Sequence, residues 1–428
     1  MSRPARKTRS LTKWLSRAAA PTVVSLCAAW YFHDSFLDQM PNASLSDFRC
    51  YYLAAQHVVR GESPYLAEGY LYPPLLACLL TPLAPLDYVP ARWVWFLFSH
   101  VCLLAAALLI WCHLGSDWIA ACTVAVVWAM GAAAGESLSL GQIGPQLTLL
   151  LAAAYTLSGR RQGVCIGMGF ALKLIPGVLC AILALRRDWR ALSAAMATAA
   201  LLLAVPWVML VCCLSGPKAP VRQDYLAGTP SVLSWSLPSV ALRIYEPLSP
   251  GGPMPNDWIT GNGLPGLRLS AGQRVLSAGV ALITLAVGCL IMAIRVRGRL
   301  SARQVSLAAA AIIALALAAS PVSWTHYQVM QYPGVALFLS YAVRRRLWWL
   351  LAAALVCGAF LYPLPVAVLR AYYERSNSWP NSPAVMYFWT SISPVASLVL
   401  FGLMTRELPR VVSGAESLTT TYPEAAVS

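Results

Sequence analysis

Long apolar segments alternate with short polar or basic segments along this chain. Twelve of the apolar segments have about the length needed to cross a hydrocarbon core of roughly 30 Å. Their recurrence from near the N-terminus to Phe401 predicts an all-α polytopic membrane protein with about 12 transmembrane helices. The predicted spans are 15–32, 73–86, 93–112, 118–134, 145–158, 163–185, 191–214, 275–294, 304–320, 327–343, 347–365 and 384–405.

Two internal segments are too polar to lie in lipid. They run from His33 to Leu71 and from Ser215 to Arg274, and the second is rich in Pro, Gly and Asn. Counting spans from the N-terminus places both on the outer side, where an external reaction centre could form. We therefore expect residues 1–405 to form a single transmembrane domain, with 406–428 as a disordered cytoplasmic tail.

Composition and charge agree with a membrane protein. Hydrophobic residues make up 59% of the chain and charged residues only 11%, against about 25% charged residues in soluble domains. The formal net charge of +15 could indicate nucleic-acid binding, but the Lys and Arg residues fall in short clusters between apolar segments. Such clusters are topology signals, so we expect membrane lipids and no nucleic acid as partners.

The basic clusters predict that both termini are cytoplasmic. The clusters at 186–190, 295–303 and 344–346 then lie inside, but Arg160-Arg161 does not. One alternative removes this conflict: 163–185 forms two half-length helices broken near Lys173 to Pro176, with a second such short hairpin near 72–92. Helices broken at membrane depth are tolerated where they line a cavity, so this alternative itself indicates a site.

The N-terminal segment has an alternative interpretation. Its basic residues followed by an apolar stretch also fit a cleaved signal peptide. We favour an uncleaved first span, because further spans follow and Trp30-Tyr31-Phe32 is typical of an interfacial anchor.

The first polar segment begins with an acidic residue and an amphipathic turn. Asp47 precedes Tyr51, Ala54, Ala55 and Val58 on one helical face, which predicts a short helix on the membrane surface. The Asp47 carboxylate can accept a proton from a sugar hydroxyl, whereas an aspartate in this position can equally cap a helix. The other carboxylates of the segment are Asp34, Asp38 and Glu62.

Lys173 is a charge deep in an apolar segment. Insertion of a lysine at the centre of a membrane helix costs about 2.5–3.5 kcal/mol, so its side chain should face protein or an anion. A lipid phosphate is one such partner; the alternative is that the side chain extends to the interface.

Other polar residues fall where an outer site could include them. His326, in a predicted outer turn, could hydrogen-bond a phosphate or an acceptor, or be structural. Gln142 could contact a sugar or a neighbouring helix, and Arg49 and Arg222 could bind phosphate or lipid headgroups. The outer-segment tryptophans that could stack on sugars or serve as interfacial anchors are Trp235, Trp258 and Trp379.

Four motifs follow one another between about residues 45 and 330. They are Asp47-Phe48 with Tyr51-Tyr52 and Gly61 to Tyr65; Tyr72-Pro73-Pro74; Gly141-Gln142 with Gly163 to Pro176 and Arg186-Arg187; and Ser320-Pro321 with Ser323-Trp324 and His326-Tyr327. In this order and spacing they resemble the family 87 glycosyltransferases of the GT-C superfamily. The best-known members of that family are polyprenyl-phosphate-mannose-dependent mannosyltransferases of actinobacteria.

The resemblance implies an inverting, metal-independent hexosyltransferase that needs no cofactor. The donor would be a polyprenyl-phosphate sugar, with mannose suggested by the resemblance alone, and the acceptor a glycolipid or glycan. The resemblance puts the catalytic base on Asp47, although GT-C enzymes often have acidic pairs where this chain has Asp47 beside Phe48. The candidates for binding donor phosphate or substrate are Lys173, His326, Arg49, Gln142 and Tyr72.

The expected location is the inner (plasma) membrane, with the active site facing the periplasm or cell exterior. A transporter or flippase is the alternative, because such proteins also have broken helices and buried charge near the midplane. Against it, no inverted repeat is visible, and the polar segments are concentrated in outer loops.

Overall fold

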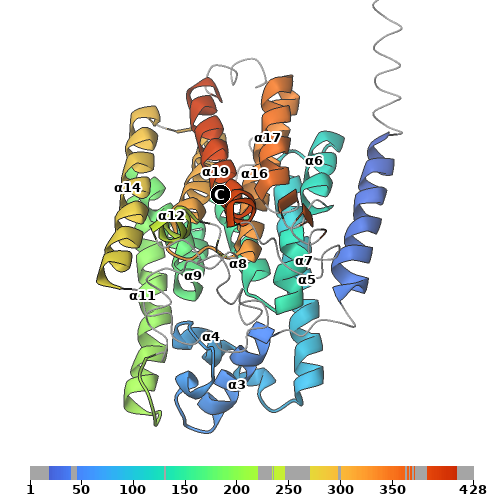
Figure 1. Ribbon diagram of the computed structural model, residues 1–428. Helices are drawn as coiled ribbons and strands as arrows, with labels where there is room; N and C mark the ends of the chain where they lie inside the picture. Colours follow the sequence, from blue (N-terminus) through green and yellow to red (C-terminus); the bar gives the residue numbers. More distant parts are fainter. Residues whose placement is uncertain are drawn as a thin grey trace, which may run out of the picture.

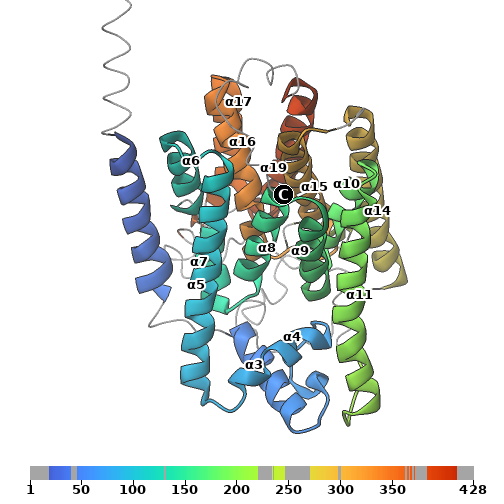
Figure 2. The ribbon, with the colours of Figure 1, turned by 180° about the vertical axis from the view of Figure 1, so that it is seen from behind.

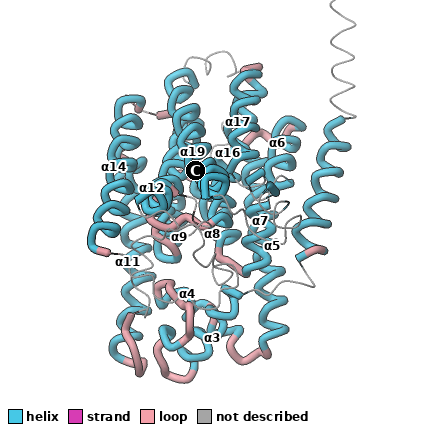
Figure 3. Tube along the Cα trace, in the orientation of Figure 1, coloured by secondary structure: helices cyan, strands magenta, loops and turns pink. Residues whose placement is uncertain are grey.

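The regular elements of the described chain are helices, which confirms the all-α class (Figure 3). The computed structural model describes residues 19–39, 46–129, 132–219, 234, 236–245, 270–296, 300–361, 364–365, 367–368, 371 and 383–411. Several helices are long and apolar enough to cross a membrane, which agrees with a polytopic membrane protein.

Three described helices pass a test for spanning by length and composition alone. They are α5 (Tyr88–His113), α11 (Trp189–Cys212) and α14 (Ala271–Arg295). A fourth span results if α6 (Trp118–Ala129) and α7 (Ala132–Leu140), which meet at a bend of 54°, are counted together. The full count of twelve is not shown by this test.

The remaining helices complete the bundle. Residues 19–31 are helical and lead into η1 (Phe32–Leu37). The others, in chain order, are α8 (Gly144–Thr156), α12 (Leu237–Tyr245), α15 (Ala302–Ala319), η6 (Thr325–Gln331), α16 (Tyr332–Arg344), α17 (Trp348–Leu361), α19 (Pro383–Glu407) and η7 (Leu408–Val411).

The segment 163–185 turns back on itself. It consists of α9 (Gly159–Leu172), η4 (Ile175–Val178) and α10 (Leu179–Leu185). Pro176 lacks an N–H donor and cannot continue α9, so the helix ends before Lys173, whose backbone is extended (φ −158°, ψ 137°). The break near Lys173 to Pro176 that the sequence suggested is therefore confirmed.

The packing of α9 on α11 shows where this hairpin begins and ends. A Cβ atom at Gly163 would collide with the Ala191 carbonyl, and one at Gly167 with the Ala195 carbonyl. The two helices therefore run parallel in close contact, with their first turns level, as small residues four apart allow. Because α9 and α11 begin at the same end, α10 must return the chain to that end.

The segment 73–86 also returns to the side from which it starts. It forms α4 (Pro74–Leu79) and η3 (Thr81–Leu83), and it begins and ends beside α3 (Ser46–Val59). The Tyr52 hydroxyl of α3 donates to the Leu86 carbonyl over 2.6 Å. The expectation that 73–86 crosses the membrane is thus wrong, since its prolines limit each helix to two turns or fewer.

Helices α3 and α4 form a layer below α8 and α9, beside the ends of α5 and α11 (Figures 1 and 2). The predicted helix after Asp47 is present as α3. However, its apolar residues Tyr51, Ala54 and Ala55 are buried in the protein core, where α3 packs on α4 and η2 (Pro64–Leu66). This face therefore packs against protein, whereas the sequence predicted that it would lie on the membrane surface.

The basic clusters gather at the opposite end of the bundle from α3. Parallel packing of α9 and α11 places Arg160-Arg161 at the level of 186–190. The Ser306 hydroxyl, near the start of α15, donates to the Tyr155 carbonyl at the end of α8 over 2.9 Å. The cluster that ends at Arg303 therefore lies beside the start of α9.

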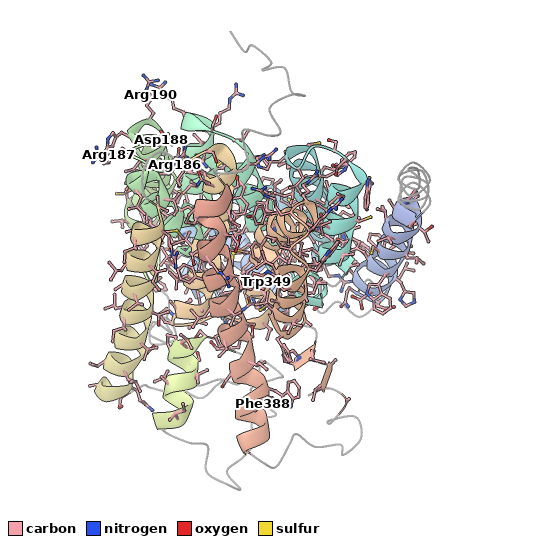
Figure 4. All side chains as sticks on the ribbon, turned by 90° about the horizontal axis from the view of Figure 1, so that it is seen from above. Arg186, Arg187, Asp188, Arg190, Trp349 and Phe388 are labelled. Atoms are coloured by element: carbon pink, nitrogen blue, oxygen red, sulfur yellow. The ribbon has the colours of Figure 1, made fainter. Side chains whose placement is uncertain are left out.

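The last two basic groups, at Arg344 and Arg406, lie at the same end of the bundle. Arg344, at the end of α16, forms an ion pair with Asp117 just after α5, with Nη1 and Oδ2 2.7 Å apart. Arg406 lies over the Trp349 ring, 4.9 Å from its centroid, where α19 ends and α17 begins. In Figure 4, Arg186, Arg187 and Arg190 lie at one edge, and Phe388, near the start of α19, lies at the opposite edge.

The ordered chain continues past the predicted start of the tail at Arg406. Glu407 and Leu408 are buried, and the Gln304 amide donates to the Leu408 carbonyl over 2.9 Å. These contacts keep η7 on α15, so a tail can begin only after Val411; residues 412–428 lie outside the described chain.

Candidate active site

A chain of hydrogen bonds joins Asp47 to Lys173 through Gln142 and Tyr72. The Gln142 Nε2 group donates to the Asp47 carboxylate. The Gln142 Oε1 atom accepts from Tyr51 Oη at 3.1 Å and from Tyr72 Oη at 2.9 Å. Lys173 Nζ donates to Tyr72 Oη over 3.4 Å. Because two phenols occupy Oε1, the amide must present its N–H group to Asp47.

The end of α7 places Gln142 at the centre of this chain. Gly141 has a positive φ of 70°, its N–H bonds the Leu138 carbonyl, and the Gln142 N–H bonds the Ser137 carbonyl. This pattern is a Schellman motif, which glycine favours because it adopts positive φ without strain. The Trp95 indole of α5 donates to the Gly141 carbonyl over 2.8 Å and fixes the turn. The Gly141-Gln142 motif is therefore a helix end that aims an amide side chain.

Helix α3 places Asp47 through its next residue. Phe48 is fully buried and stacks on Trp95 with ring centroids 5.5 Å apart. Asp47 is half-buried, so a ligand can reach this residue. Burial raises the pKa of Asp47 to about 6, while the positive charge of Lys173 opposes the shift.

Lys173 lies at the tip of the hairpin formed by α9 and α10. Its Nζ atom is 3.2 Å from the centroid of the Tyr327 ring and 5.5 Å from that of Tyr72. The ammonium group is therefore held between two aromatic faces, a favourable arrangement for a cation. The side chain is half-buried, as expected for a cation that can still meet an anion.

His326 stands behind Tyr327 on η6. The two rings meet edge to face, with centroids 4.8 Å apart, and His326 is only 4% exposed. Its Nε2 atom has no hydrogen-bond partner among the described residues. A buried group in this position can support Tyr327 and Lys173, but it presents little surface to a ligand.

The site thus has an accessible layer and a supporting layer. The accessible side chains, all half-buried, are Asp47, Tyr72, Lys173 and Tyr327; the buried ones behind them are Tyr51, Gln142 and His326. A ligand between Asp47 and Lys173 would meet a carboxylate on one side and an ammonium group on the other. Such a pair can accept a proton and stabilise an anion within one reaction.

The structure does not bring every predicted residue into this group. Arg49 points into solvent one residue beyond Phe48 and is exposed. Glu62 pairs with His57 over 2.7 Å, and Asp38 with His33 over 3.4 Å. Asp34, in η1, lies beside Gly135 of α7, where its Oδ2 atom would be 3.6 Å from a Cβ atom added at that glycine. The candidates Arg222, Trp235, Trp258 and Trp379 lie outside the described residues.

Two members of the group were not among the candidate site residues. Tyr51 and Tyr327 both lie in the sequence motifs, but Tyr51 was assigned to an apolar helical face and Tyr327 to the start of a span. The signal that could have identified them is a tyrosine in a motif that also holds polar residues, because a buried phenol needs a hydrogen-bond partner. Position alone does not reveal which partner it has.

Comparison with known proteins gives one family and a distant relative. The model of glycosyltransferase family 87 matches residues 70–321. A polyprenol-phosphate-mannose-dependent alpha-(1-2)-phosphatidylinositol mannoside mannosyltransferase of Mycobacterium tuberculosis (strain ATCC 25618 / H37Rv) is 26% identical over 372 residues, which cover 81% of each chain. No solved structure matches the chain. Tyr72, Gln142 and Lys173 lie within the family match, whereas Asp47 precedes it and His326 follows it.

Proposed function

The chain belongs to glycosyltransferase family 87, whose model matches more than half of it, and we propose that it transfers mannose from a polyprenyl phosphate to a glycolipid. The observation that carries this proposal is the hydrogen-bonded chain from Asp47 to Lys173 through Gln142 and Tyr72. It brings a carboxylate, which can accept a proton, and an ammonium group, which can bind a phosphate, to the same half-buried surface.

We assign Asp47 as the general base. A sugar hydroxyl is a poor nucleophile until its proton is accepted, and a positioned carboxylate contributes roughly 10²–10⁴-fold to such a step. The acceptor oxygen forms a bond to the anomeric carbon as the bond from that carbon to the phosphate oxygen breaks. The hydroxyl proton passes to Asp47, and the electron pair of the broken bond leaves with the polyprenyl phosphate.

We assign Lys173 to the donor phosphate. Phosphate is already a good leaving group, so a positive charge beside it suffices and no acid is needed. Tyr72 lies between Lys173 and Gln142, and its hydroxyl can donate or accept a hydrogen bond at the same surface. His326 supports this group from behind Tyr327, and the exposed Arg49 is left as a contact for lipid headgroups.

The reaction is inverting in this proposal. A retaining double displacement needs a second nucleophilic carboxylate and a covalent sugar intermediate. Only Asp47 takes part in the hydrogen-bonded chain, since Glu62 is paired with His57 elsewhere in the described structure. One displacement with one base is therefore the simplest chemistry for this surface.

We further propose a topology with both termini in the cytoplasm and the site outside. Of the twelve predicted segments, 73–86 and 163–185 would enter and return, and the other ten would cross. The gathering of the basic clusters at the end opposite Asp47 supports this orientation, because cytoplasmic segments carry an excess of Lys and Arg. Residues 1–411 would form one domain, placed in the inner (plasma) membrane.

The sugar and acceptor classes come from the mycobacterial relative. Its name states a polyprenol-phosphate-mannose donor and a phosphatidylinositol mannoside acceptor. We propose the same donor and, more broadly, a glycolipid acceptor for this chain. Family membership also removes the reason for keeping a transporter as the alternative.

Transfer of radiolabel from polyprenyl-phosphate mannose by membranes containing the protein tests this function. We expect a labelled glycolipid with wild-type protein and none with Asp47→Asn, which keeps the size of the side chain but removes the base. Glu62→Gln is the matched control and should retain activity, because Glu62 pairs with His57. Full activity of Asp47→Asn would move the base elsewhere, and a product of retained configuration would exclude inversion.

A further inference from the structure

Two arginines on neighbouring helices lie around one tyrosine where α3 meets the start of α5. The positive charges of Arg92 and Arg49 both act on the Tyr88 hydroxyl. Arg92 follows Tyr88 by four residues in α5, so the two side chains share one face of that helix. Arg49 is exposed and Arg92 is half-buried, so a ligand can reach both.

Aromatic packing joins the two helices at this point. The Phe48 ring stacks on the Tyr88 ring with centroids 6.2 Å apart, and the centroid of the Tyr52 ring lies 5.5 Å from that of Tyr88. Arg49 directly follows Phe48, which is fully buried, so the backbone of Arg49 is held beside α5. The backbone positions that carry the two arginines are therefore fixed by packed rings.

Membrane topology does not explain these two arginines. The basic clusters gather at the other end of the bundle, whereas Arg49 and Arg92 lie at the end that holds Asp47. Arg92 precedes Trp95 and Phe96 by three and four residues, and both of those side chains are buried. Arg92 therefore lies on the face of α5 that meets protein, whereas an arginine that only contacts surrounding lipid is expected on the exposed face.

The chemistry of this pair fits a phosphate group. A guanidinium group has planar N–H donors that can bind two phosphate oxygens at once. Arg49 forms no ion pair with another residue of the described chain. The carboxylates nearest in sequence are Asp47, which accepts from Gln142, and Asp87, which is exposed. Two guanidinium groups beside a phenol can therefore hold an anion that has several oxygen acceptors.

The geometry of an inverting transfer distinguishes between the two substrates. The attacking hydroxyl and the leaving phosphate lie on opposite sides of the anomeric carbon. Lys173, assigned above to the donor phosphate, reaches Asp47 through Tyr72 and Gln142. Helices α9 and α5 stand toward opposite sides of α3 (Figures 1 and 2). An anion on the α5 side of Asp47 therefore belongs to the acceptor.

We propose that Arg49 and Arg92 bind the phosphodiester of the glycolipid acceptor, the group that links its lipid to its sugar headgroup. The assignment rests on the proposed function. Holding the phosphodiester on the α5 side would leave the headgroup free to present its hydroxyl to Asp47. The donor and acceptor phosphates would thus have separate cationic sites on either side of the base.

A pair of acceptors that differ only in charge tests this site. One is a diacyl phosphatidylinositol mannoside, and the other is the same lipid with its phosphate methylated to a neutral triester. Arg49→Gln and Arg92→Gln should each raise KM for the charged acceptor about fivefold or more, equivalent to about 1 kcal/mol. Their KM for the triester and for the donor should stay within about twofold of wild type.

Arg60→Gln is the matched control. Arg60 is also exposed and lies in the turn after α3, at the other end of that helix from Arg49. It should behave as wild type with both acceptors. Because Arg49 is exposed, Arg49→Gln should fold normally, and it carries the test even if Arg92→Gln is unstable.

Ionic strength gives a second readout in neutral detergent micelles. Salt screens exposed charges, so KM of the wild-type protein for the charged acceptor should rise with salt, while KM for the triester should not. The combined Arg49→Gln and Arg92→Gln variant should lose most of this salt dependence. Phosphatidylglycerol should compete with the charged acceptor much less strongly than unlabelled phosphatidylinositol mannoside does.

Several outcomes would overturn the proposal. Unchanged KM for the charged acceptor in Arg49→Gln and Arg92→Gln would remove both residues from acceptor binding. A rise in donor KM instead would assign the arginines to the donor phosphate, and equal competition by phosphatidylglycerol would indicate a general site for anionic lipids. If wild-type protein transfers mannose to neither acceptor, the proposed function fails instead.

Discussion

The Lys173 ammonium group lies 3.2 Å from the centroid of the Tyr327 ring, at the tip of a helical hairpin that returns to its starting side. A cation over an aromatic face gains about 0.5–2 kcal/mol, depending on how fully it is desolvated. The contact therefore holds the charge in place whether or not an anion is bound. It does not neutralise that charge, which remains available to the anion.

Removing the Tyr327 ring should weaken donor binding. We expect Tyr327→Leu to raise KM for polyprenyl-phosphate mannose by roughly 3- to 30-fold, the equivalent of the cation–π energy. Tyr327→Phe keeps the ring and should stay close to wild type. Lys173→Met keeps the stem but removes the charge, so it should be the most severe of the three. Donor binding measured by titration would contradict this order if Lys173→Met retained full affinity.

The pKa of Asp47 predicts an acidic limb in the pH profile. Since burial raises this pKa to about 6, the base is protonated at a higher pH than an ordinary carboxyl, and kcat/KM should fall as pH decreases through about 6. Lys173 favours the ionised carboxylate. Lys173→Met should therefore raise the Asp47 pKa further and move the limb to higher pH. A limb that stays in place in the residual activity of Lys173→Met would show that the two groups do not interact.

Gln142 should act by orienting Asp47, because its own side chain is buried. Gln142→Glu replaces the N–H donor with a negative charge next to the carboxylate. We expect a large loss of kcat with a smaller change in donor KM, and an acidic limb shifted to higher pH. Gln146→Glu is a useful comparison, since Gln146 is also buried but donates to Ser99 of α5. It takes no part in the hydrogen bonds that join Asp47 to Lys173. A loss confined to donor KM would instead assign Gln142 to direct substrate binding.

Much of this architecture follows from patterns with a simple physical cause. Apolar length gives membrane helices, and Pro176 gives the break in the segment that carries Lys173, because proline removes a helical hydrogen bond. The sequence also identified Asp47, Gln142, Tyr72 and Lys173, whose side chains form the hydrogen-bonded chain. Asp47 and Lys173 stood out as charged residues beside or within an apolar segment, where charge is costly. Tyr72 and Gln142 were identified from the motifs that carry the family resemblance.

The sequence was less informative where a contact between residues far apart in the chain determines the structure. Nothing local shows that Tyr51 donates to Gln142, 91 residues away, or that the apolar face of α3 meets protein and not lipid. Similarly, hydrophobic length cannot distinguish a crossing helix from a hairpin of two short ones. Packing of Gly163 and Gly167 on α11 decides that question for 163–185.

That packing predicts a sensitive position on α9. A Cβ atom at Gly167 would collide with the Ala195 carbonyl, and backbone cannot move aside as a flexible side chain can. We expect Gly167→Leu to lower the thermal stability of detergent-purified protein and to reduce donor binding, because the hairpin tip carries Lys173. Gly279→Leu on α14 is the matched control, since a Cβ there would meet nothing within 4 Å. Equal stability of the two variants would argue against close packing of α9 on α11.

The hairpin also makes a sharp prediction about topology. If α9 and α10 return to the side on which α9 begins, Arg161 and Arg187 lie on the same side, whereas a single crossing would put them on opposite sides. Cysteine labelling with a membrane-impermeant maleimide can test this in sealed right-side-out vesicles, using variants in which the other cysteines are replaced. We expect Arg161→Cys and Arg187→Cys to stay unlabelled until the vesicles are permeabilised, because basic clusters favour the cytoplasmic side. Cys213, exposed at the far end of α11, is the outward-facing control and should be labelled at once. Labelling of Arg161→Cys alone from outside would mean that 163–185 crosses the membrane, which would separate Lys173 from the outer surface that the proposed reaction requires.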